Sequence, residues 1–203
     1  MLPRILLVNN YLVEEKIRQL EASLASNGAS VTVIESADST PKRFNEYDGV
    51  VLSGSPAMLS DPGSEAPYSG EIEAIKQSKA PVLGICFGHQ LMGRAFGSRV
   101  IRGAEEIKRY VETEILVKDP LFARLPRIIS VFESHYEVVE TLPKDFVLLA
   151  RSPTSQIAAM GHNALPLIGV QFHPERNSQP MPDGNVLVGN FVRACSRRTI
   201  IAR

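Results

Sequence analysis

The chain has 203 residues, and 22 Lys and Arg residues balance 22 Asp and Glu residues, so its formal net charge is zero. This balance, without a long basic run, disfavours nucleic acid as a partner. No apolar stretch approaches the roughly 18 residues that a membrane span requires, and the amino end reads as a first strand rather than a signal peptide. We therefore expect one cytoplasmic, soluble domain spanning residues 1–203, with no membrane partner.

The first half of the chain alternates strand-like and helix-like segments. An apolar run over residues 2–8 predicts a strand, and apolar residues then recur at helical spacing. Short apolar runs predict further strands at 31–34 and 49–52, and a helix is expected over 71–79. Strands separated by helices predict a parallel sheet. The segment 53–67, rich in Gly, Ser, Pro and Asp, should be a loop at the carboxyl end of a strand, where open α/β sheets bind ligands.

The second half reads as strand-like pieces with fewer helices. A single helical turn between prolines is expected over 119–126, and an amphipathic helix over 186–195. The predicted strands cover residues 109–117, 128–132, 146–150, 156–159 and 167–172. We therefore expect antiparallel or mixed strands added to an α/β sheet that is mostly parallel and flanked by helices.

A reactive cysteine is predicted in the stretch Pro81-Val82-Leu83-Gly84-Ile85-Cys86-Phe87-Gly88-His89-Gln90. The apolar run reads as a strand and residues 90–96 as a short helix, so Cys86 occupies a sharp turn between them. The partial positive charge of a helix N-terminus favours the thiolate. Gly84 and Gly88 fit a backbone that bends tightly and lets a substrate approach. The alternative is a buried cysteine that acts as a small hydrophobic residue.

A second informative stretch is Leu167-Ile168-Gly169-Val170-Gln171-Phe172-His173-Pro174-Glu175, a strand that ends in a histidine and a glutamate. Residues two apart in an extended chain point to the same face, so Glu175 can orient the ring of His173 and stabilise its imidazolium form. His173 can then deprotonate Cys86 and later protonate a leaving amine. The alternative is a histidine that is hydrogen-bonded for structural reasons.

Three motifs, in this order, resemble those of class I, triad-type glutamine amidotransferases: Ser53-Gly54-Ser55-Pro56, Gly84-Ile85-Cys86-Phe87-Gly88-His89-Gln90 and Val170-Gln171-Phe172-His173-Pro174-Glu175. The likeness spans nearly the whole chain and implies the open, flavodoxin-like sheet of that family. It also implies hydrolysis of L-glutamine through a thioester on Cys86, with the ammonia passed to a synthetase partner.

The same resemblance implies roles for further residues. The backbone amides of Ser55 and Phe87 would form the oxyanion hole, in which one donor contributes about 2.7–4 kcal/mol. Substrate binding is assigned to Gly54, Gln90, Ser134, His135 and Tyr136. His89 is expected to fix the first helical turn rather than to act as a base.

The segment Glu133-Ser134-His135-Tyr136-Glu137-Val138-Val139 is similar to one in GMP synthase glutaminases, as is Leu148-Leu149-Ala150-Arg151-Ser152. This similarity implies a free-standing glutaminase that docks on a separate ATP pyrophosphatase chain and supplies ammonia for GMP synthesis from XMP. The sequence has neither a cluster at metal-ligand spacing nor a phosphate-cradling loop. We therefore expect no metal or cofactor on this chain, and ATP and Mg only on the partner.

Several positions depart from that pattern. Ser55 stands where the family usually has a second glycine, so a positive φ there would add strain of about 1 kcal/mol. We hypothesise that a partner or substrate orders this loop. Glu137 replaces a usual aspartate, Arg176 stands where valine is usual, and Asn9-Asn10-Tyr11 lacks the usual Asn-Gly-Gly-Gln run. Because these differences bear on partner docking, three alternatives stay open: a paralogue serving another synthetase, a stand-alone γ-glutamyl hydrolase, and a non-catalytic regulatory module.

The remaining candidates receive structural roles. Cys195 is predicted to be inert core on the last helix. His162, within Met160-Gly161-His162-Asn163, is expected to lie on a loop surface. Residues 197–203 are expected to form a frayed tail.

Overall fold

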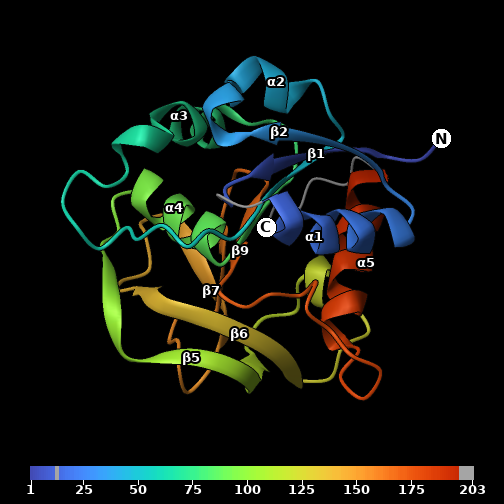
Figure 1. The fold of residues 1–203 in the computed structure, drawn as a ribbon. Coiled ribbons are helices and arrows are strands. Elements are labelled where there is room, and N and C mark those ends of the chain that lie inside the picture. Colours follow the sequence, from blue (N-terminus) through green and yellow to red (C-terminus); the bar gives the residue numbers. More distant parts are fainter. Residues whose placement is uncertain (12–13, 197–203) are drawn as a thin grey trace.

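The computed structural model describes residues 1–11 and 14–196 and contains a nine-stranded sheet with the order β2-β1-β3-β4-β9-β8-β7-β5-β6 (Figure 1). The strands are β1 (Arg4–Asn9), β2 (Ser30–Glu35), β3 (Gly49–Leu52), β4 (Val82–Ile85), β5 (Val100–Ile115), β6 (Ile128–Val139), β7 (Phe146–Arg151), β8 (Ala159–His162) and β9 (Leu167–Val170). The helices are α1 (Glu14–Ser26), α2 (Pro41–Asn45), α3 (Ser69–Gln77), α4 (Phe87–Ala95) and α5 (Asp183–Ser196), with 3-10 turns η1 (Ser36–Asp38), η2 (Ala66–Tyr68) and η3 (Pro120–Phe122). The predicted tail at 197–203 lies outside the described residues.

The parallel half of the sheet consists of β2, β1, β3, β4 and β9. Every residue of β3, β4 and β9 is buried, as expected for strands covered on both faces. One core lies on the side of α1 and α5, with Leu20 and Phe191, and the other on the side of α3 and α4, with Ile75 and Leu91. The predicted α/β sheet, parallel in this half, is confirmed. Its carboxyl edge carries both chemically interesting stretches.

The antiparallel half consists of β8, β7, β5 and β6. β5 and β6 form a long hairpin that lies below the parallel half in Figure 1. The sheet curls, so that Phe132 of β6 pairs with His173 beyond the end of β9. Both hairpin strands extend well past the predicted ranges 109–117 and 128–132. The curl brings β6 over the carboxyl ends of the parallel strands.

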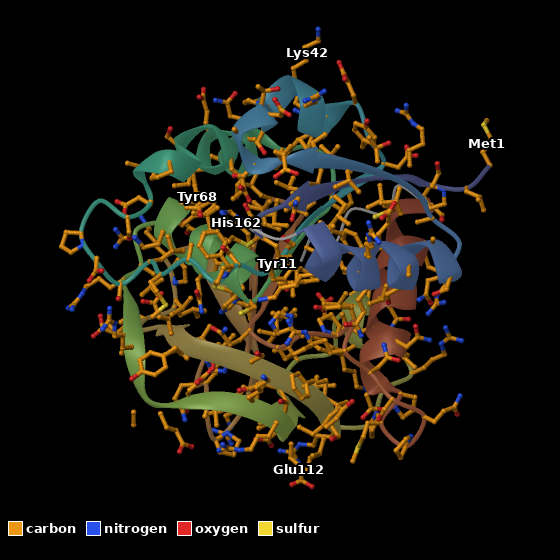
Figure 2. All side chains as sticks on the ribbon, in the orientation of Figure 1. Met1, Tyr11, Lys42, Tyr68, Glu112 and His162 are labelled. Atoms are coloured by element: carbon orange, nitrogen blue, oxygen red, sulfur yellow. The ribbon has the colours of Figure 1, made fainter. Side chains whose placement is uncertain are left out.

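Four local features differ from the predictions. β8 covers Ala159–His162 rather than 156–159, and α2 was not predicted. His162 is 9% exposed and its ring packs against Phe96 and Phe146, so its assignment to a loop surface is wrong. Figure 2 shows His162 inside the molecule, whereas Lys42 and Glu112 project outward. The predicted helix after Cys86 begins earlier than residue 90, directly at Phe87.

Cys195 occupies the core, as predicted. It is 1% exposed on α5, and burial raises the pKa of its thiol to about 12. The thiol is therefore protonated and inert at neutral pH. Among the described residues, no helix combines the length and apolar character needed to cross a membrane.

Candidate active site

The turn at Cys86 has an unusual backbone conformation. Cys86 has φ 50° and ψ −99°, and α4 begins at the next residue. Its amide donates to the Val170 carbonyl at 2.8 Å, and its carbonyl accepts from the Gln90 amide at 3.0 Å. These bonds hold a conformation that costs a non-glycine residue about 1–3 kcal/mol. The thiol is thereby fixed at the carboxyl edge of the sheet and next to a helix N-terminus.

The two flanking glycines serve packing rather than substrate approach. A Cβ atom on Gly84 would lie 2.6 Å from the Gly88 carbonyl oxygen. One on Gly88 would lie 2.7 Å from the Leu52 carbonyl oxygen. The positive φ of the predicted tight bend falls on Cys86 itself. Both glycines therefore let α4 pack closely on β3 and β4.

His173 and Glu175 form the predicted pair. Nδ1 of His173 lies 2.7 Å from Oε1 of Glu175, and both side chains are 3% exposed. The His173 amide donates to the Phe132 carbonyl at 2.7 Å, which fixes the chain beyond β9. Burial lowers the pKa of His173, but the charges of Glu175 and Cys86 raise it further, to about 10. Burial raises the pKa of Glu175, and the charge and hydrogen bond of His173 lower it to below its usual range.

The high pKa of His173 changes the expected first step. At neutral pH its ring carries the proton, because Glu175 faces one side of it and Cys86 the other. An imidazolium beside a thiol stabilises the thiolate. The resting His173 is therefore in the imidazolium form that Glu175 was predicted to stabilise, whereas His173 was also expected to deprotonate Cys86.

Cys86 is also contacted from the neighbouring strands. Its Sγ atom lies 3.6 Å from the Ser134 carbonyl oxygen of β6. The side-chain amide of Gln171 donates to Sγ at 3.7 Å, and Gln90 donates to Oε1 of Gln171 at 3.3 Å. Gln171 was missed by the sequence analysis. Its place two residues before His173, on the same face of an extended chain, was the available signal.

A cavity of about 450 Å³ opens at Cys86. Seven predicted site residues line it: Ser55, Cys86, Gln90, Ser134, His135, Tyr136 and His173. The other three lie just behind its wall. Phe87 is 1% exposed and follows the nucleophile, Glu175 stands behind His173, and a Cβ on Gly54 would lie 2.9 Å from Cε1 of His173. The structure thus brings all ten predicted residues to one place.

The expected strain at Ser55 is absent. Among the described residues other than glycine, only Cys86, Arg124 and Asp145 have positive φ. Ser55 instead stabilises its own turn, because its hydroxyl accepts from the Ala57 amide at 3.0 Å. The loop that carries Ser55 therefore adopts an ordinary backbone conformation without a second glycine.

The rings of two histidines near the site contact protein groups. Nε2 of His135 lies 2.7 Å from Oε2 of Glu133, and the His135 side chain is 3% exposed. Ser152 donates to the other Glu133 oxygen at 2.8 Å. His89 is fully buried against Gly169, and burial lowers its pKa to about 3. His89 is thus neutral at physiological pH.

The wall and mouth of the cavity contain residues that the sequence analysis did not assign to the site. Tyr11 is 7% exposed, and burial together with the charge of Glu175 raises its pKa. Figure 2 shows it in the interior beside α1. Three basic residues and two acidic residues also line the cavity: Lys16, Lys108, Arg176, Glu106 and Glu137. These residues are separated by up to 160 positions, and only the fold brings them together.

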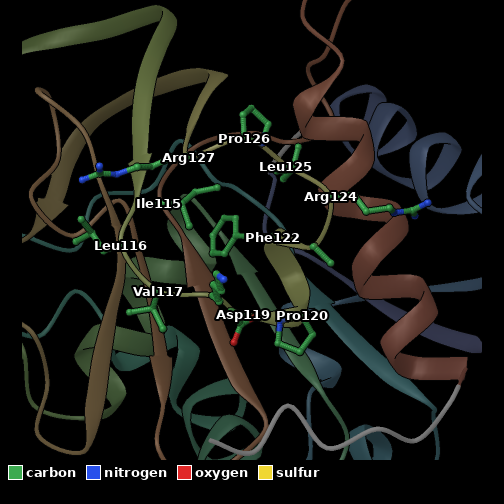
Figure 3. A pocket seen from close by; sticks show the side chains of 12 residues that line it. Ile115, Leu116, Val117, Asp119, Pro120, Phe122, Arg124, Leu125, Pro126 and Arg127 are labelled. Carbon is green, nitrogen blue, oxygen red and sulfur yellow. The ribbon is translucent and has the colours of Figure 1, made fainter.

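A larger cavity, of about 770 Å³, lies elsewhere, between the ends of β5 and β6 (Figure 3). Residues 115–120 and 122–127 line it, among them Phe122 and Leu125. None of the predicted site residues lies in its wall, and the wall contains neither a cysteine nor a histidine. The smaller cavity at Cys86 is therefore the site of the chemistry.

Comparison with known proteins agrees with this geometry. The family model for class I glutamine amidotransferases matches residues 6–195. The chain is similar to a protein of Pyrococcus abyssi that is named as one subunit of glutamine-hydrolysing GMP synthase, with 41% identity over 72% of this chain and 75% of that protein. The protein of the same name from Methanosarcina acetivorans is 35% identical over 96% of this chain and 97% of its own length.

Solved structures show the same fold. A candidate GMP synthase subunit from Thermoplasma acidophilum superimposes with a TM-score of 0.86 and 25% identity, over 98% of this chain and 96% of that one. A glutamine amidotransferase from Thermotoga maritima has a TM-score of 0.75 and 19% identity, over 98% and 99% of the two chains. The curled mixed sheet with flanking helices is common to these proteins.

Proposed function

The chain belongs to the class I glutamine amidotransferase family, and we propose that within this family it is the glutaminase subunit of a two-subunit GMP synthase. It is an enzyme that hydrolyses L-glutamine and supplies ammonia to a synthetase. The similarity to GMP synthase subunits over nearly their whole length supports GMP synthesis from XMP as the acceptor reaction. The observation that carries the glutaminase chemistry is the Cys86–His173–Glu175 arrangement at the cavity.

The reaction begins with attack of the Cys86 thiolate on the side-chain amide carbon of glutamine. The backbone amides of Ser55 and Phe87 stabilise the resulting oxyanion. His173 donates its proton to the departing ammonia, which leaves a thioester on Cys86 and a neutral imidazole. Water then attacks the thioester and gives a proton to His173. Collapse of the second oxyanion releases glutamate and regenerates the ion pair.

Glutamine is held by the strand and helix that face Cys86. Both hydrogen bonds donated by the Gln90 side chain go to protein oxygens, at 2.6 Å to Glu137 and 3.3 Å to Gln171. A contact with substrate therefore falls to the side-chain oxygen Oε1 of Gln90, an acceptor for the α-ammonium group. The backbone groups of Gly54 and of Ser134, His135 and Tyr136 bind the remainder of the amino-acid end.

The partner is an ATP pyrophosphatase subunit. ATP and Mg bind to that partner, because thioester chemistry at Cys86 requires neither of them. This chain carries no cofactor or metal in the proposed reaction. The enzyme acts in the cytoplasm, where XMP and reduced thiols are available, and it engages neither nucleic acid nor a membrane. The net charge of zero supports the last point.

The test uses the chain together with the ATP pyrophosphatase subunit of its source organism. The wild-type pair should form GMP from XMP with either glutamine or ammonia as the nitrogen source. Cys86→Ala should abolish the glutamine-dependent reaction and leave the ammonia-dependent one unchanged, because only the thioester step is lost. GMP synthesis from glutamine by the Cys86→Ala pair contradicts the proposal, and so does faster turnover of γ-glutamyl amines than of glutamine by the wild type.

A further inference from the structure

The loop that carries Ser55 is attached to β6 through one buried carboxylate. The loop comprises residues 53–60 and leaves the end of β3. Oε2 of Glu137 accepts a hydrogen bond from the Leu59 amide at 2.6 Å, and Oε1 accepts one from the Ser60 amide at 3.1 Å. Glu137 is 2% exposed and Leu59 is fully buried. Both carboxylate oxygens therefore accept hydrogen bonds from the backbone at the far end of the loop.

A carboxylate suits this position because two adjacent backbone amides need acceptors. A buried amide without a partner costs about 1–3 kcal/mol, and hydrogen bonds to a charged acceptor are stronger than neutral ones. A carboxamide offers only one acceptor oxygen and would turn an NH₂ group toward the second amide. The contact is thus specific for a carboxylate of this reach.

The backbone of the same residue supports the substrate side of the cavity. The Glu137 carbonyl accepts from the Gln90 side chain at 2.6 Å. Three residues earlier on β6, the Ser134 carbonyl lies 3.6 Å from the sulfur of Cys86. Glu137 therefore joins the Ser55 loop, the substrate-binding strand and the helix after the nucleophile.

We propose that Glu137 is a positioning residue for the oxyanion hole, because its carboxylate fixes loop 53–60 on β6 with the Ser55 amide at the Cys86 cavity. This inference rests on the proposed glutaminase function. It corrects the expectation that position 137 bears on partner docking, since a side chain that is 2% exposed has no surface to offer a partner. The long separation of 78 residues between Glu137 and Leu59 concealed the contact in the sequence.

Two electrophilic reagents distinguish an effect on the oxyanion hole from an effect on the Cys86 thiolate. A γ-glutamyl-type chloromethyl ketone, in which the ketone replaces the glutamine amide, reacts when Cys86 adds to the carbonyl and chloride is then displaced, so its rate depends on stabilisation of an alkoxide. Iodoacetamide reacts by direct displacement of iodide at carbon, so its rate reports the thiolate alone. The second-order rates of labelling at Cys86 are measured for both reagents by mass spectrometry, on the full chain.

Glu137→Gln should lower the ketone rate at least about tenfold, of the order expected for one misplaced oxyanion donor, and leave the iodoacetamide rate within about twofold. Glu137→Asp reaches only one of the two amides and should give an intermediate ketone rate, and it serves as the test if the Gln variant does not fold. Glu112→Gln, an exposed change on β5, is the matched control and should leave both rates unchanged.

Three outcomes have distinct meanings. A folded Glu137→Gln variant that keeps the wild-type ketone rate overturns the positioning role. Equal losses of both rates also overturn it, because they show a general disturbance of Cys86. Absence of ketone labelling in the wild type contradicts the glutaminase function instead.

Discussion

The strained backbone conformation of Cys86 is stabilised by hydrogen bonds to neighbouring elements rather than by a glycine at this position. Positive φ at a non-glycine residue persists only where surrounding contacts determine it. Here the amide and carbonyl of Cys86 are bonded to β9 and α4, and His173 faces its thiol. The reactivity of the thiol thus depends on charges from a segment more than eighty residues away, which makes it sensitive to single changes there.

Glu175→Gln tests this dependence. Burial lowers the pKa of His173, and the charge of Glu175 is one of the causes that raise it to about 10. Without that charge, the pKa of His173 should fall, so that less imidazolium is present at pH 7 to stabilise the thiolate. We expect alkylation of Cys86 by iodoacetamide at pH 7 to slow by about tenfold or more, of the order of 1.4 kcal/mol. The measurement is the alkylation rate between pH 6 and 10.

Glu46→Gln is a suitable control, because it removes an exposed carboxylate far from the ion pair in sequence and should leave the profile unchanged. A Glu175→Gln variant with the wild-type rate at pH 7 would show that Glu175 orients His173 without stabilising its charge.

Among the secondary-structure elements, β3 and α5 meet at a close contact. A Cβ atom on Gly49 would overlap the sulfur of Cys195 and lie 3.0 Å from Cδ1 of Ile5. Gly49→Ala should therefore lower the free energy of unfolding by about 1–3 kcal/mol, as overpacking does. Cys195→Ala removes the sulfur, so the double variant should be more stable than the sum of the single effects predicts. Urea denaturation of all four proteins measures this coupling, and strict additivity would exclude a direct clash.

Glu71 of α3 supports the carboxyl end of β3, where loop 53–60 begins. Its carboxylate accepts from Asn10 at 3.2 Å and from Ser36 at 2.6 Å, and the Asn10 amide donates to the Ser53 hydroxyl at 2.8 Å. Burial raises the pKa of Glu71 to about 7, and these two hydrogen bonds offset only part of that rise. The native chain therefore keeps the Glu71 proton at pH values where the unfolded chain has lost it.

This difference predicts a pH dependence of stability. The favourable contribution of protonated Glu71 is complete below its usual pKa of 4.5 and is lost as the pH rises through about 7. A shift of this size corresponds to about 3 kcal/mol. Glu71→Gln does not titrate, so its free energy of unfolding relative to wild type should rise by about that amount between pH 4.5 and pH 8. Chemical denaturation at several pH values measures the difference, and a difference that is constant with pH would contradict a raised pKa.

The parallel half of the fold could be predicted because its strands are short, continuous apolar runs, as in residues 49–52. The triad followed from the same logic, since β4 and β9 are neighbours and their ends place Cys86 and His173 together. β6 was predicted too short because its buried face carries Glu133, His135 and Glu137, which do not read as core. Their partners lie far away in the sequence, so no local pattern reveals that these charges are satisfied.

At the scale of the whole molecule, the opening of the Cys86 cavity is lined by charged residues that are mostly basic. Lys16 and Lys108 are exposed, Arg176 is partly exposed, and Glu106 is the one acidic residue among these four lining residues. The excess of positive charge favours a partner surface that is acidic around the point where ammonia leaves. Sealing this mouth would keep ammonia from solvent, so the synthetase should dock here.

Lys108→Glu tests the docking face. Reversal of one exposed charge at an interface edge mainly slows association, and we expect the dissociation constant for the synthetase partner to rise about tenfold at low salt, or about 1.4 kcal/mol. The effect should shrink as ionic strength increases, because exposed charges are screened beyond about 10 Å at 0.1 M salt. Lys79→Glu is the matched control: it makes the same exposed charge change just before β4, at the amino edge of the parallel strands, and should bind normally. Isothermal titration of each variant with the synthetase measures both constants, and equal weakening by the two variants would place the docking surface elsewhere.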